Sequence, residues 1–164
     1  MVISAINTAL TEEYIRHEPE GKFLERKGRN TKHSKIANEL VGMLNAGGGV
    51  LIYGIADDGT VESLAETDLL QDSSIDLDLY RKLVHDFIKP PANIEIEEVY
   101  LADGSLVFIY HVEPTFEGVY QRKDNEEVYL RVADSNKGAL RRDEVAKLEY
   151  NRGIRNYEEE IVSD

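Results

Sequence analysis

The chain has 164 residues, 41% of them hydrophobic and 31% charged, which suits one folded domain and excludes a disordered chain. It has no cysteine, which excludes disulfides, thiolate zinc sites and thiol catalysis and agrees with a cytoplasmic location. No apolar run approaches the ~20 residues of a membrane helix, and a net charge of −13 disfavours wrapping a polyanion unaided.

The first half of the chain is expected to alternate helices and strands. The segment Thr11–His17 fits a short helix, and Lys22–Lys27 alternates as a strand does. A helix capped at Asn30 or Thr31 is predicted to run to about Ala46, where three glycines end it. The run Val50–Ile55 is almost continuously apolar, which indicates a strand buried on both faces.

The second half is expected to consist mainly of hairpins between two helices. Its predicted elements are a helix over Asp76–Ile88, a hairpin of Ile94–Leu101 with Leu106–Val112, a second hairpin of Val119–Arg122 with Val128–Val132, and a helix over Arg141–Asn151. This order predicts an α+β fold with a mixed sheet flanked by helices. We expect a single domain over residues 1–164 with its core at about 18–152, and the acidic end also suits a piece of a longer regulator.

Carboxylates occur at two places where a strand is predicted. Asp57 and Asp58 form a turn at the end of the buried strand, while Glu20 precedes the first predicted strand and Glu25 lies in it. Alternation places Glu25 and Lys27 on one face, where they are expected to pair. A Glu, Glu and Asp set that meets a Lys is typical of a divalent-metal site that activates water. An exposed Glu–Lys pair beside an ordinary turn explains the same residues without a metal.

Basic residues gather locally on this acidic chain. Lys27, Arg29 and Lys32 lie in a segment whose acids are few, so a basic face on an acidic body is predicted. Near the other end, Arg131 lies on an alternating strand and Lys137 lies in an expected polar loop. These five residues are the candidates for contact with nucleic-acid phosphates. A core strand followed by a capped helix explains Arg131 and Lys137 without any ligand.

Three segments together resemble the Schlafen/AlbA-type domain family. Its pattern of a Gly-Gly turn and a strand ending in Gly-Val-x-Asp-x-Gly is matched in register by Asn45, Gly48, Gly49, Gly54, Asp57 and Gly59. Glu20, Glu25 and Lys27 match its first strand, and Tyr129, Leu130, Arg131 and Val132 match its last. On spacing alone the glycines merely form a turn between a helix and a strand.

The resemblance implies a nucleic-acid-binding domain of a bacterial transcriptional regulator, with DNA or RNA as the partner and no membrane. It also implies an alternative, a metal-dependent nuclease in which Glu20, Glu25 and Asp57 hold Mg²⁺ or Mn²⁺. A third interpretation is a protein-interaction or oligomerisation module, in which exposed hairpin edges pair with a second subunit to form a dimer. The absence of a phosphate-loop lysine argues against ATP binding.

Overall fold

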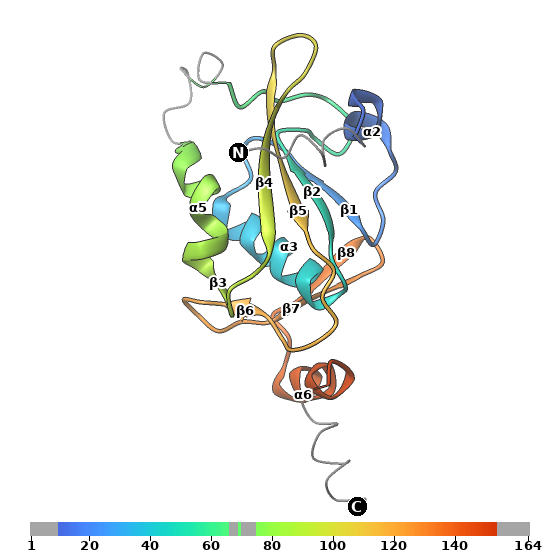
Figure 1. The fold of residues 1–164 in the computed structure, drawn as a ribbon, viewed down its shortest axis with the longest axis vertical. Helices are drawn as coiled ribbons and strands as arrows, with labels where there is room; N and C mark the ends of the chain where they lie inside the picture. The colour runs from blue at the N-terminus through green and yellow to red at the C-terminus, as the bar shows by residue number, and fades with distance from the viewer. Residues whose placement is uncertain (1–9, 66–68, 70–74, 154–164) are drawn as a thin grey trace, which may run out of the picture.

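A four-stranded mixed sheet forms the centre of the structure, a computed structural model that describes residues 10–65, 69 and 75–153 (Figure 1). The strands lie in the order β1 (Leu24–Lys27), β2 (Gly49–Tyr53), β5 (Leu106–Val112) and β4 (Ile94–Tyr100). The first pair is parallel and the other two are antiparallel. The prediction of an α+β fold with a mixed sheet is therefore confirmed.

Helices cover both faces of this sheet. On one face α3 (His33–Asn45) and α5 (Leu77–Phe87) pack on the even-numbered residues of β5, such as Phe108 and Tyr110. On the other face α2 (Glu12–His17) inserts Ile15 against Ile52 and Ile109. Because both faces are covered, the central strand β5 is buried at every residue. None of the helices in the described residues is long and apolar enough to cross a membrane.

The helix α3 and the glycine turn after it are held to the rest of the fold by Asn45. This buried amide donates to the carbonyl oxygens of Tyr120 and Tyr129, at 2.9 and 2.8 Å, and its oxygen accepts from the Tyr120 amide at 2.8 Å. At Gly48 the φ angle is +96°, and a Cβ there would lie 2.7 Å from the Val112 carbonyl oxygen. Only glycine suits both this backbone conformation and the close approach to β5.

The C-terminal third differs from the prediction. The expected hairpin of Val119–Arg122 with Val128–Val132 is wrong, because β6 (Gln121–Arg122) pairs with β3 (Ile88–Lys89), which follows α5 directly. The strand β7 (Tyr129–Val132) pairs instead with β8 (Ser135–Gly138), where a polar loop was expected. Alternation along a strand identifies its faces but not its partner, and both segments alternate equally well.

The remaining predicted elements are present, with ends that differ by a few residues. The hairpin of β4 and β5 projects beyond the other strands, and α6 (Arg142–Asn151) lies at the opposite end of the molecule (Figure 1). The strand β1 begins at Leu24, two residues later than predicted. That residues 1–164 form a single domain stays a prediction, since both ends lie outside the described residues.

Candidate metal centre

Three carboxylates from separate segments meet at the outer edge of β1. Glu20 precedes this strand, Glu25 lies in it, and Asp57 lies in the turn after β2. One oxygen from each residue lies within 4.8 Å of one oxygen from each of the others. The parallel pairing of β1 and β2 brings the turn after β2 to the C-terminal end of β1. Glu20 reaches the same place because the chain before β1 folds back along this strand, with an antiparallel bridge between Gly21 and Leu24.

Backbone contacts hold the two outer carboxylates in place. Glu20 accepts a hydrogen bond from the Arg26 amide at 2.8 Å through Oε2, across the open edge of β1. The turn that carries Asp57 is closed by hydrogen bonds between Ala56 and both Gly59 and Thr60. Arg16 of α2 also donates to the Gly59 carbonyl oxygen at 3.3 Å. Asp57 itself is exposed, so that solvent and ligands reach its carboxylate.

Glu25 is the buried member of the three, with 5% of its surface exposed. Its Oε2 accepts from Arg131 Nη1 at 2.8 Å, and its Oε1 lies 3.5 Å from Lys27 Nζ. Burial raises the pKa of Glu25 above its ordinary value, and the nearby Glu20 carboxylate acts in the same direction. Lys27 and Arg131 lower the same pKa and only partly offset the burial.

Arg131 does not suit the role of phosphate contact that the sequence suggested. Its side chain has no exposed surface. Its guanidinium donates to the carbonyl oxygens of Gly21, Lys22 and Leu24 as well as to Glu25. The alternation of β7 made this face look exposed, but the segment before β1 covers it. We therefore correct the expectation: Arg131 holds the strand that carries Glu25.

The other predicted phosphate contacts are spread over several elements. Lys27 lies between Glu25 and Glu39, and the pairing expected between Glu25 and Lys27 is present at 3.5 Å. Arg29 is half-buried and donates to the Ser63 carbonyl oxygen at 3.1 Å. Lys32 at the start of α3 and Lys137 in β8 are exposed. Only these last two of the five are exposed, and Lys137 forms an ion pair with Glu144.

Glu39 of α3 is a site residue that the sequence reasoning missed. It is buried, and its Oε1 lies 3.4 Å from Lys27 Nζ. A signal was present in the sequence, because Glu39 follows Ile36 by three residues and precedes Met43 by four, on the apolar stripe of the predicted helix. A charged residue on such a stripe indicates a buried ionic partner.

The three carboxylates fit a hard divalent cation. Such cations prefer carboxylate oxygens, and ligands on opposite sides of Mg²⁺ lie about 4.2 Å apart. The separation of up to 4.8 Å therefore requires only a small inward movement of the side chains, of which Asp57 is exposed and Glu20 is half-buried. The chemistry of the donors and their spacing agree with the group that the family resemblance implies.

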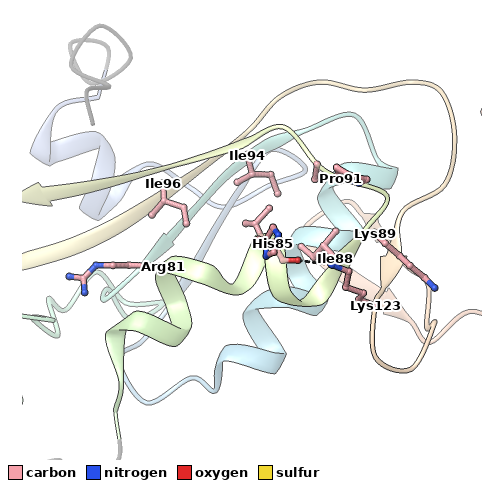
Figure 2. Close-up of a pocket in the computed structure, with 10 residues that line it drawn as sticks. Arg81, His85, Ile88, Lys89, Pro91, Ile94, Ile96 and Lys123 are labelled. Carbon is pink, nitrogen blue, oxygen red and sulfur yellow. Dashed lines mark hydrogen bonds between the residues drawn. The ribbon is translucent and has the colours of Figure 1, made fainter.

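A pocket of about 440 Å³ lies elsewhere, between α5 and β4. Figure 2 shows Ile94 and Ile96 of β4 across from His85 and Ile88, with Arg81 and Lys89 pointing away at opposite ends. Arg81 forms ion pairs with Asp78 and Glu98. None of the site residues predicted from the sequence lines this pocket. The pocket borders β4, whereas the carboxylates lie at β1, the opposite edge strand of the sheet.

Comparison with known proteins identifies a family and two structures of similar fold. Residues 20–140 match the family described as Schlafen, AlbA_2. The DIP2311 protein from Corynebacterium diphtheriae is 20% identical, with a TM-score of 0.48 over 79% of this chain and 24% of that one. This chain thus corresponds to about a quarter of that protein. No curated protein has a matching sequence.

The second structure is the N-terminal domain of a protein from Nitrosomonas europaea described as related to the ATP-dependent DNA helicase RecG. It is 13% identical, with a TM-score of 0.46 over 79% of this chain and 90% of that one.

Proposed function

Since this chain belongs to the Schlafen, AlbA_2 family, we propose that it cleaves nucleic acid with a divalent cation held by Glu20, Glu25 and Asp57. The observation that carries the proposal is the meeting of these carboxylates within 4.8 Å, from segments up to 37 residues apart in sequence. A cation also offsets the acidity of the chain at the point where a phosphate approaches.

The residues of the chain have distinct tasks in this proposal. Glu20 and Asp57 present carboxylates at the surface, and Glu25 presents one from the protein interior. Arg131 keeps Glu25 oriented through its hydrogen bond to Oε2. When bound, Mg²⁺ or Mn²⁺ supplies a Lewis acid and lowers the pKa of a bound water.

The variant Asp57→Asn tests the proposal most cleanly, because the side chain is exposed and lies in a turn. We expect cleavage of structured RNA or single-stranded DNA with Mn²⁺ to fall more than about 100-fold, since losing a ligand exceeds the 10–100-fold cost of an outer-shell partner. The rate is measured by gel electrophoresis of end-labelled substrate.

The matched control is Asp58→Asn, an exposed neighbour whose Oδ1 accepts from the Thr60 amide at 2.9 Å. Asparagine keeps that hydrogen bond, so cleavage is expected to stay within twofold of the unmodified protein. Equal activity of the two variants would show that another site, or a co-purified nuclease, does the cleaving.

Cation affinity is expected to depend on pH above the usual carboxylate range. The pKa of Glu25 lies above 4.5 because the side chain is buried, and a protonated carboxyl does not bind a cation. Below that pKa, affinity for Mn²⁺ should fall by about tenfold per pH unit, since one proton competes with the cation. Calorimetric titrations from neutral pH down through pH 4.5 measure this, and an affinity that begins to fall only below pH 4.5 contradicts it.

A regulatory nucleic-acid-binding domain without cleavage is the second candidate function. The exposure of Lys32 favours it, because an accessible ammonium group replaces counterions on phosphates. Lys137 is exposed as well, although its ammonium pairs with Glu144. Fluorescence anisotropy with the same DNA and RNA separates the two functions. Salt-dependent binding that Asp57→Asn leaves intact, without cleavage by either protein, would identify a binding domain of the kind found in transcriptional regulators.

A further inference from the structure

One ammonium group is shared between two buried carboxylates beside the candidate metal centre. Lys27 Nζ lies 3.5 Å from Glu25 Oε1 and 3.4 Å from Glu39 Oε1. Both carboxylates are almost fully buried, whereas 22% of the Lys27 side chain is exposed. The lysine therefore lies midway between a proposed cation ligand and a second acid that takes no part in the cluster.

One carboxylate oxygen of Glu39 accepts no hydrogen bond. Its Oε2 is buried, makes no hydrogen bond, and lies 3.7 Å from Arg131 Nη1. Its Oε1 also lies 3.8 Å from Nζ of Lys35, a largely exposed side chain. A buried carboxylate oxygen without a donor is uncommon, because the lost hydration is normally replaced by a hydrogen bond.

We infer that Glu39 is a positioning residue that takes Lys27 away from Glu25 when a divalent cation binds there. The inference rests on the proposed function. Like charges a few ångströms apart repel in a partly buried site, so a cation on Glu25 and the ammonium of Lys27 compete for the same oxygens. Glu39 already lies at contact distance from Lys27, so the ammonium can move to it without entering apolar surroundings.

Neutralising Glu39 removes this alternative partner. In Glu39→Gln the shape is kept, but Lys27 retains only Glu25 as a close carboxylate among the described residues. Mn²⁺ must then displace the ammonium from Glu25 with no second carboxylate to receive it. We expect the affinity for Mn²⁺ to fall about tenfold, within the range for outer-shell partners of metal ligands.

A double-mutant cycle with Lys27→Gln separates this role from a general effect of charge. The affinity of the whole chain for Mn²⁺ is measured by calorimetry in four proteins: unmodified, each single variant and the double variant. With Lys27 replaced, there is no ammonium to transfer, so Glu39→Gln should change the affinity less than about threefold. Thermal unfolding without metal verifies that each protein is folded.

Two further variants sharpen the result. Lys35→Gln removes the exposed partner of Glu39 and should leave the affinity unchanged, while Glu39→Asp keeps the charge, shortens the reach and should give an intermediate loss. The same loss from Glu39→Gln with and without Lys27 would overturn the inference, as would no loss at all. Failure of the unmodified chain to bind Mn²⁺ would instead overturn the proposed cation site, and the inference with it.

Discussion

Replacing Arg131 with methionine is expected to lower the free energy of unfolding by about 3–5 kcal/mol, the usual cost of removing one partner of a buried ion pair. Methionine fills much of the volume but leaves the Glu25 carboxylate without its guanidinium. The backbone carbonyl oxygens of Gly21, Lys22 and Leu24 also lose this donor, and within the described residues only that of Leu24 keeps another, the Gly21 amide. No water can replace the guanidinium easily, because the Arg131 side chain has no exposed surface.

The size of this effect follows from the number of groups that one side chain satisfies. Arg131 lies in β7, yet every hydrogen-bond partner of its guanidinium lies in or just before β1, about 110 residues earlier. The guanidinium thus fastens the C-terminal hairpin to the edge of the central sheet. Arginine suits this role because its planar group offers five donors in a fixed arrangement.

Urea unfolding followed by circular dichroism measures the change, with Arg142→Met as the control. Arg142 is exposed at the start of α6, so its replacement should cost less than about 0.5 kcal/mol. Adding Glu25→Gln to Arg131→Met removes the unpaired buried charge and should restore part of the lost stability. A loss below about 1 kcal/mol for Arg131→Met would contradict the buried network.

The burial of Arg131 could not be predicted from the sequence. Periodicity located α3, α5 and the β4–β5 hairpin, because each has a long pattern with a clear stop signal. It placed Arg131 on a polar face of its strand but carried no information on what covers that face. The covering segment is distant in sequence, and its free carbonyl oxygens are a property of the fold rather than of residue type.

The candidate metal centre was predicted from the family resemblance and not from periodicity. Spacing alone did not distinguish Glu20, Glu25 and Asp57 from a surface ion pair and a turn; the family resemblance brought them together as a set. The parallel pairing of β1 and β2, together with the fold-back of the chain before β1, explains why they converge. Glu39 was not predicted, because helical periodicity identifies the apolar residues of a buried stripe and does not single out an acid that lies among them.

Asn45→Asp is expected to be the second most damaging substitution, costing about 3 kcal/mol or more at neutral pH. The change keeps the size of the side chain and the oxygen that accepts from the Tyr120 amide. It replaces the amide nitrogen, which donates to two carbonyl oxygens, with a second oxygen. A negative charge would then face two carbonyl dipoles in a buried position.

This damage should be reversed in part by acid. The folded state disfavours the ionised form, so the pKa of the introduced carboxyl is raised in the folded state above its unfolded value of about 3.9. The penalty is fully present above the folded pKa and shrinks as the pH falls through it, since the protonated acid can donate one hydrogen bond again. Urea unfolding of the variant and the unmodified chain, compared at neutral and acidic pH, measures the difference.

Two controls separate this effect from a general response to an added charge. Asn93→Asp places the same charge at an exposed position and should change stability by less than about 0.5 kcal/mol at either pH. Asn45→Ala removes both donors and the acceptor but adds no charge, so its cost should not vary with pH. If the cost of Asn45→Asp were equally independent of pH, the amide would not be donating to Tyr120 and Tyr129.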